Sequence, residues 1–73
     1  MRIRNNLPLL IKNRGWNNSK LARETGILRT YIVYIADGRM MPTNEQLEKI
    51  CLALKVTADM IYPDPEVQKA LGL

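Results

Sequence analysis

Apolar residues recur every three or four positions along most of the chain, and no stretch alternates regularly between apolar and polar residues. A spacing of three and four places side chains on one face of an α-helix, whereas a β-strand needs an alternation of two. The pattern predicts helices over residues 7–13, 18–25, 29–36 and 58–62. A fourth helix starts within residues 42–46, and a short helical tail over 63–73 starts at Asp64-Pro65-Glu66. The predicted fold class is therefore all-α.

Residues that begin or end helices set these boundaries. Asn6 and Asn17 are predicted N-caps, because an Asn side chain accepts a hydrogen bond from a free N–H of the first turn. Thr43 and Gln46 have the spacing of a capping box, and Thr57 is the predicted cap of the fifth helix. Glycine favours the left-handed backbone that ends a helix, and glycines follow four of the helices, at Gly15, Gly26, Gly38 and Gly72.

The fourth helix carries the clearest core stripe, with Leu47, Ile50, Cys51 and Leu54 at positions i, i+3, i+4 and i+7. We interpret Cys51 in this stripe as a small buried hydrophobe, and Trp16 as a core residue. Val67, Ala70 and Leu71 are predicted to give the helical tail one apolar edge. Apolar residues near the end of the chain either close the core or form a dimer contact; they are Met60, Ile61, Tyr62, Val67 and Leu71.

Length and composition restrict the class of protein. Seventy-three residues, of which 47% are apolar and 25% charged, are typical of one small globular domain, here residues 1–73 with a core over 5–62. The sequence has one cysteine and no histidine, which excludes a disulfide framework, multi-ligand zinc sites and histidine-based catalysis. We expect no enzyme activity, no metal, no cofactor and no small-molecule ligand.

The chain has no apolar run of 18 residues and no apolar N-terminal stretch typical of a signal peptide. A lone cysteine is typical of a reducing compartment. We therefore expect a cytoplasmic protein without a membrane partner.

Charge is distributed unevenly along the chain. Residues 1–39 contain eight basic and two acidic residues, whereas residues 40–73 contain three basic and five acidic ones, which gives net charges of +6 and −2. The basic half is the candidate surface for a polyanion, although a solvated basic surface would have the same composition.

Residues 17–38 have the pattern of two short helices joined by a tight turn at Gly26. Glycine adopts the left-handed conformation of that turn at low cost, and Ala22 allows the second helix to approach closely. Ile27 is predicted to fill the angle between the helices, while Ile32 and Ile35 anchor the second helix. This spacing predicts a helix-turn-helix, whose second helix lies in the DNA major groove.

The chain resembles the Cro/repressor-type, or XRE-like, helix-turn-helix transcriptional regulators over about residues 5–62. The resemblance rests on residues in this order: Leu21-Ala22, Gly26-Ile27, Ile32, Ile35, Asp37-Gly38-Arg39, Pro42, Leu47, Ile50, Ala53-Leu54 and Val56. It implies a compact five-helix, lambda-repressor-like domain that binds double-stranded DNA. It also implies a bacterial or phage repressor that acts as a homodimer on an inverted-repeat operator.

The resemblance also implies which residues contact DNA. Positions that face base edges are matched by Arg29, Thr30, Val33 and Tyr34. Positions that contact the DNA backbone are matched by Asn18, Asp37 and Arg39. The spacing agrees for the third helix, because Ile32, Ile35 and Ala36 form its predicted inner side and leave the four base-facing positions outside.

The chain departs from the family pattern at two places. Leu28 occupies the usual Ser or Thr cap of the third helix, so one N–H there lacks a side-chain partner. Ile11 and Ala36 stand where many members have a buried arginine–glutamate pair, and replacing both partners by apolar residues is often neutral or stabilising.

Two interpretations stay open. The apolar residues Tyr31, Val33 and Tyr34 could instead bind a protein, as in a small antitoxin or an adaptor. Arg2 and Arg4 are either an arm on the DNA backbone or solvated charges of a terminus.

Overall fold

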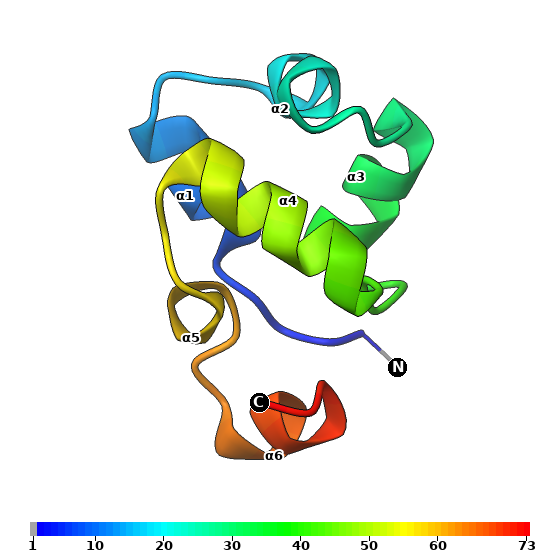
Figure 1. Ribbon diagram of the computed structural model, residues 1–73, viewed down its shortest axis with the longest axis vertical. Helices are drawn as coiled ribbons and strands as arrows, with labels where there is room; N and C mark the ends of the chain where they lie inside the picture. Colours follow the sequence, from blue (N-terminus) through cyan, green and yellow to red (C-terminus); the bar gives the residue numbers. More distant parts are fainter. Residues whose placement is uncertain (1) are drawn as a thin grey trace.

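The computed structural model describes residues 2–73, and these form six helices joined by short turns (Figure 1). Residue 1, which belongs to the predicted domain, lies outside the described residues. The helices are α1 (Leu7–Asn13), α2 (Asn18–Thr25), α3 (Arg29–Ala36), α4 (Asn44–Leu54), α5 (Ala58–Ile61) and α6 (Pro65–Ala70). The all-α class and the five-helix domain with a helical tail are confirmed, and the tail forms α6.

The core lies behind α4, which crosses the middle of the molecule in Figure 1. α2 lies above it and α3 to its right in that view, α1 lies behind it, and α5 and α6 lie below it. The most deeply buried side chains come from five helices and the α5–α6 link; they are Leu7, Leu21, Ile32, Ile35, Ile50, Ile61 and Tyr62. Burying each large apolar side chain stabilises the folded state by about 1.5–3 kcal/mol, and this is the main stabilising contribution.

Two of the predicted caps are present. Asn17 Oδ1 accepts a hydrogen bond of 2.8 Å from the Lys20 N–H at the start of α2. At α4, Thr43 Oγ1 accepts from the Gln46 N–H and Gln46 Oε1 accepts from the Thr43 N–H, which completes the capping box.

Two other predicted caps are wrong. Asn6 does not cap α1, because its side chain donates instead to the Met60 carbonyl; Asn5 Oδ1 accepts from the Leu7 N–H in its place. Thr57 precedes α5 but its side chain makes no capping hydrogen bond. Tertiary contact, and not residue type, decides which of the two neighbouring asparagines caps α1.

Three further expectations are corrected near the C-terminal end. α5 ends at Ile61, one residue before the predicted end. Cys51 is half-buried rather than buried, because it lies at the edge of the α4 stripe in a shallow groove beside Ala58 and Leu71. Ala70, expected on the apolar edge of the tail, is exposed, whereas Leu71 is buried and Val67 packs half-buried against the core.

The extended segment over residues 2–6 is bonded to the ends of two helices. The Ile3 N–H donates to the Gly38 carbonyl (2.8 Å) just beyond α3, and the Asn6 N–H donates to the Ile61 carbonyl (2.8 Å). Gly38 has a φ of 79°, and a Cβ there would collide with the Ile3 carbonyl oxygen. A glycine at this position therefore allows both the turn and the close approach of the N-terminal segment.

Replacing Gly38 by alanine tests this close approach, with Gly15 as the matched position. Both glycines have a φ near +78° (79° and 77°), but a Cβ at Gly15 meets no atom within 4 Å. We expect Gly15→Ala to lower the free energy of unfolding by about 1 kcal/mol through backbone strain alone. Gly38→Ala should lower it by roughly 3 kcal/mol because the collision adds to the strain. Equal losses in urea unfolding would contradict the packing of residues 2–6.

The Tyr62 side chain places a polar hydroxyl group in the apolar core. Its hydroxyl is buried, and within residues 2–73 it has no hydrogen-bond partner. Burial raises the pKa of Tyr62 from 10.0 to about 12, because the phenolate form would lose its hydration.

Removing this hydroxyl should change how stability depends on pH. Below pH 10, we expect Tyr62→Phe to keep or raise the free energy of unfolding, since no hydrogen bond is lost. Above pH 10 the tyrosine ionises first in the unfolded wild type, so stability falls as the pH rises towards the folded pKa of about 12. Urea unfolding in that range should show a smaller alkaline loss for Tyr62→Phe; an equal loss would contradict the raised pKa.

Candidate nucleic-acid interface

The turn between α2 and α3 sets the angle between the two helices. Gly26 ends α2 with a left-handed backbone (φ 74°), and its N–H donates to the Ala22 carbonyl at 2.9 Å. Ile27 follows and is buried in the angle, as the sequence predicted. α3 therefore leaves the turn in a direction fixed by both backbone conformation and apolar packing.

Thr25 is a functional part of this turn that sequence reasoning missed. Its hydroxyl is buried, donates to the Leu21 carbonyl at 2.8 Å and accepts from the Ile27 N–H at 3.2 Å. The hydroxyl thus connects the last turn of α2 to the residue that fills the angle. The signal was the spacing of Leu21 and Thr25, since residues four apart lie on the same helix face.

α3 has a buried side and an exposed side. Ile32 and Ile35 are buried against α2 and the core, as predicted. Arg29, Thr30 and Tyr34 are exposed on the opposite side. Val33 and Ala36, expected on the outer and the inner side respectively, are both half-buried, because they lie at the boundary between the two sides.

The start of α3 lacks a side-chain cap, as the leucine at this position predicted. The helix nevertheless begins at Arg29, because the Leu28 carbonyl accepts hydrogen bonds from the Tyr31 and Ile32 N–H groups at 3.0 and 3.2 Å. The Leu28 side chain is 67% exposed. Arg29 is therefore the first residue of the helix, and it is exposed.

Asn18, Val33 and Asp37 line one shallow groove together with Pro8 and Ala36. The groove brings the N-terminal end of α2 next to the outer flank of α3. Residues that the resemblance assigned to base contacts and to backbone contacts therefore share one surface. Arg29 and Thr30 lie on the same helix, one to two turns before the groove.

Asp37 and Arg39 form an ion pair directly after α3. Arg39 Nε lies 2.7 Å from Asp37 Oδ2, and Arg2 Nη1 lies 3.3 Å from Asp37 Oδ1. The three side chains are 37–62% exposed, so solvent screens the pairs. The loop residues of the candidate site are thus already paired with each other.

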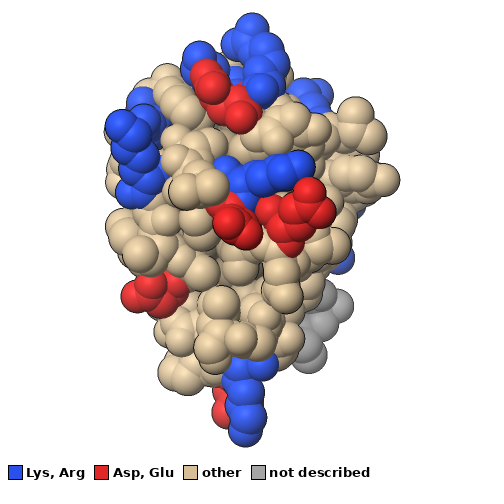
Figure 2. All heavy atoms as spheres, in the orientation of Figure 1, with Lys and Arg blue, Asp and Glu red and all other residues tan. Residues whose placement is uncertain are grey.

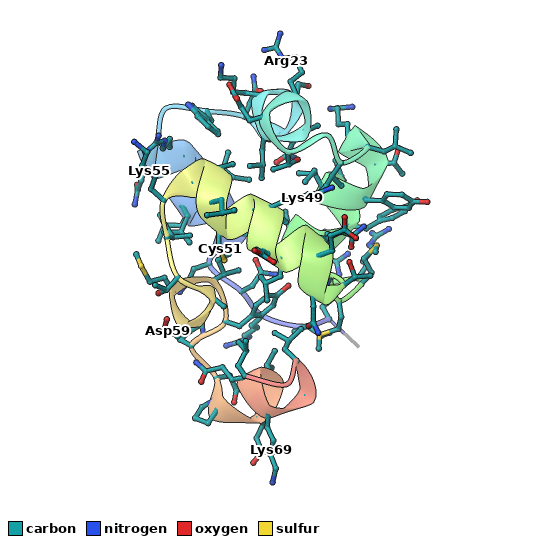
Figure 3. All side chains as sticks on the ribbon, viewed as in Figure 1. Arg23, Lys49, Cys51, Lys55, Asp59 and Lys69 are labelled. Carbon is teal, nitrogen blue, oxygen red and sulfur yellow. The ribbon has the colours of Figure 1, made fainter. Side chains whose placement is uncertain are left out.

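Basic side chains differ in whether a carboxylate pairs with them. The face over α4 carries basic and acidic side chains next to each other (Figure 2). Lys49, which lies over the middle of α4 in Figure 3, pairs with Glu45 at 3.3 Å, and Lys20 pairs with Glu24 at 2.9 Å. Arg29 on the outer side of α3 makes no ion pair with any residue in 2–73. No carboxylate in residues 2–73 therefore neutralises the charge of Arg29.

The described residues offer little for metal or nucleophilic chemistry. No cluster of three or more Cys, Asp and Glu side chains in residues 2–73 has the arrangement of a metal site. Burial, and then the charge of Asp59, raise the pKa of the Cys51 thiol, which keeps it in the less nucleophilic protonated form. Within the same residues, no helix combines the length and the apolar character that crossing a membrane requires.

Comparison with known proteins adds a family and a fold. The sequence pattern of the helix-turn-helix domain family matches residues 5–65. A hypothetical transcription factor from Neisseria meningitidis serogroup B is 33% identical over 61 residues, which are 84% of this chain and 58% of that protein. The chain thus spans less than two thirds of the length of this relative.

Two solved structures have a similar fold. The hypothetical transcription factor NHTF from Neisseria has a TM-score of 0.73 at 32% identity, over 90% of this chain and 76% of the other. The restriction-modification controller protein C.AhdI from Aeromonas hydrophila has a TM-score of 0.71 at 21% identity, over 77% of this chain and 85% of the other. The second likeness concerns the fold alone.

The role of Thr25 can be tested with a substitution of nearly the same shape. Thr25→Val leaves the buried Ile27 N–H without an acceptor, so we expect the free energy of unfolding to fall by about 1–3 kcal/mol. Thr30→Val, on the exposed side of α3, should change it by less than about 0.5 kcal/mol. Chemical unfolding of both variants measures the difference, and a Thr25→Val protein as stable as the wild type would contradict a structural role for the hydroxyl.

Proposed function

The chain belongs to the helix-turn-helix domain family, and from this premise we propose that it binds double-stranded DNA sequence-specifically and regulates transcription. The resemblance to Cro/repressor-type regulators that the sequence indicated is confirmed at the level of the family. The observation that carries the proposal is the exposed outer side of α3, with an arginine that has no ion-pair partner in residues 2–73.

Arg29 has the central role in base recognition. Its guanidinium can donate two parallel hydrogen bonds to O6 and N7 of a guanine in the major groove. A cation in the first turn of a helix opposes the helix dipole, so an arginine at this position does not stabilise α3. The Thr30 hydroxyl can form a hydrogen bond with a base edge without selecting one base. Val33 can contact a thymine methyl group, and the Tyr34 hydroxyl can reach a base or a phosphate.

Contacts to the DNA backbone would come from the ends of the motif. Asn18 is the first residue of α2, where free N–H groups and an amide side chain suit a phosphate oxygen. Arg39 lies just beyond the C-terminal end of α3 and supplies a cation. Asp37, which the resemblance also assigned to the backbone, carries the same sign of charge as a phosphate.

We propose further that two copies act together as a repressor on an inverted repeat. Helix-turn-helix dimers bind half-sites about one helical turn, or ~34 Å, apart. The longest dimension of this domain is 29 Å, so one copy fits within each half-site. Repression then requires only that the dimer occupies the operator, without chemistry.

A second candidate function rests on exposed apolar side chains. Leu28, directly before α3, is 67% exposed, and Tyr31 and Tyr34 on α3 are 43% and 41% exposed. Such a cluster also suits a protein partner, as in a small antitoxin or an adaptor. The two functions differ in whether Arg29 determines what is bound.

Selection from a random duplex library at about 0.15 M salt tests the proposal. We expect an enriched inverted repeat with half-sites ~34 Å apart. Arg29→Ala should relax the preference at one base pair of each half-site by about 1–3 kcal/mol, or about 5–150-fold. Arg23→Ala, a matched loss of one arginine on α2, should keep the motif.

The contrary results are equally specific. A wild type that enriches no sequence would overturn sequence-specific recognition by this chain. A motif that survives in Arg29→Ala would overturn the assigned role of this residue, while binding of a protein by both variants would favour the second function.

A further inference from the structure

The carboxylate of Asp37 is shared by two arginines that are far apart in the sequence. Oδ1 lies 3.3 Å from Arg2 Nη1, and Oδ2 lies 2.7 Å from Arg39 Nε. The three groups together carry one surplus positive charge. Each guanidinium has five N–H donors, so both keep donors that Asp37 does not use.

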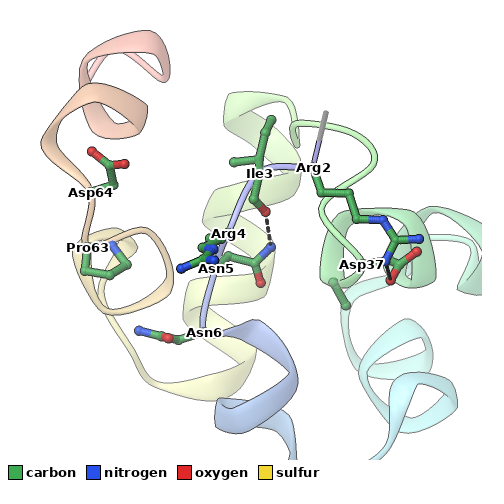
Figure 4. A pocket seen from close by; sticks show the side chains of 9 residues that line it. Arg2, Ile3, Arg4, Asn5, Asn6, Asp37, Pro63 and Asp64 are labelled. Atoms are coloured by element: carbon green, nitrogen blue, oxygen red, sulfur yellow. Dashed lines mark hydrogen bonds and ion pairs between the residues drawn. The ribbon is translucent and has the colours of Figure 1, made fainter.

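The segment that carries Arg2 is fixed to the end of α3. The Ile3 N–H donates to the Gly38 carbonyl at 2.8 Å, and Asn5 Nδ2 donates to the Ile35 carbonyl at 3.0 Å. Figure 4 shows the Arg2 side chain reaching sideways to Asp37, on the opposite side of the segment from Pro63 and Asp64. Arg2 is thus placed by neighbouring backbone contacts as well as by its ion pair.

We propose that Arg2 and Arg39 form a phosphate-binding pair and that Asp37 positions them without contacting DNA itself. This inference rests on the proposed function, because it places the pair at the C-terminal end of α3. A helix of eight residues is about 12 Å long, close to the ~12 Å width of the major groove. When the N-terminal residues of α3 contact base edges inside the groove, the opposite end of the helix and the adjoining Arg2 lie about 12 Å away from them, near the phosphates at the groove edge.

The charges in the cluster explain why Asp37 is a positioning residue. A carboxylate repels a phosphate, so a direct contact between the two is unfavourable. The same carboxylate holds the two guanidinium groups side by side before DNA arrives, which reduces the side-chain entropy lost on binding. Each arginine then donates its unused N–H groups to phosphate oxygens.

Arg4 provides a matched control within the same segment. It has the same charge as Arg2 and lies two residues away. Within residues 2–73, however, it makes no ion pair, and Figure 4 shows it on the side of the segment that faces Pro63, away from Asp37. Lys55, at the edge of the molecule opposite α3 in Figure 3, provides a distant control.

The test measures affinity for a duplex of random sequence between about 50 and 200 mM salt. Each phosphate contact contributes about 0.9 to the slope of log K against log [salt]. We expect Arg2→Gln to reduce that slope by about 0.9, so that over this range the wild type loses about 3.5-fold more affinity than the variant. Arg4→Gln and Lys55→Gln should reduce it by less than half as much, and circular dichroism should show all four proteins equally folded.

Asp37→Asn separates positioning from simple charge. It adds one positive charge, so a role of net charge alone predicts tighter binding and a steeper slope. Positioning predicts a slope no steeper than that of the wild type. It also predicts that Arg2→Gln changes the slope by less in the Asp37→Asn background than in the wild type.

Three results would overturn the inference. One is a slope change in Arg2→Gln no larger than in Arg4→Gln, and another is a steeper slope in Asp37→Asn. The third is a wild type that binds no duplex at about 50 mM salt, which would overturn the proposed function as well. Because the duplex is random, a protein that enriches no operator but loses slope in Arg2→Gln would refute sequence-specific recognition while supporting the phosphate-binding pair.

Discussion

The direction of α3 depends on the turn that precedes it, and that turn depends on one buried hydroxyl and one left-handed glycine. α2 must end at Thr25, because Gly26 turns the backbone to a φ of 74°. Thr25 then satisfies the N–H of Ile27, which would otherwise be buried without a partner. The apolar contacts of Ile32 and Ile35 can form only after this turn has directed the helix towards the core.

The far end of α3 is held by a different kind of contact. The helix ends in a left-handed turn at Gly38 (φ 79°), where the Arg39 N–H donates to the Tyr34 carbonyl at 2.9 Å. The N-terminal segment binds to this end from outside, through its hydrogen bonds to the Ile35 and Gly38 carbonyls. The helix is therefore fixed by the turn at its start, by two isoleucines along its inner side and by residues 2–6 at its end. Its outer side takes no part in this support, so the anchoring of the helix does not restrict which residues stand there.

Local chemistry made the helices predictable from the sequence, and tertiary contact limited the rest. Gly15 and Gly26 act on their own neighbours, so α1 and α2 end where the sequence predicted, and the capping box at Thr43 begins α4 within the predicted range. Asn5 and Asn6 have identical side chains, and only the nearby Met60 carbonyl decides that Asn6 is used elsewhere. The outer side of α3 followed from helical spacing, whereas the pairing of Arg2 with Asp37 joins residues 35 positions apart and has no local signature.

The charges at the two ends of α3 are opposite to those that would stabilise the helix. A helix favours an acid in its first turn and a base in its last turn, yet Arg29 begins α3 and Asp37 follows its last residue. At the C-terminal end Asp37 has partners within the protein, because it pairs with Arg2 and Arg39. At the N-terminal end, residues 2–73 contain no carboxylate that pairs with Arg29. Under the proposed function, a DNA base supplies the hydrogen-bond acceptors for this exposed arginine, which offsets its unfavourable position against the helix dipole.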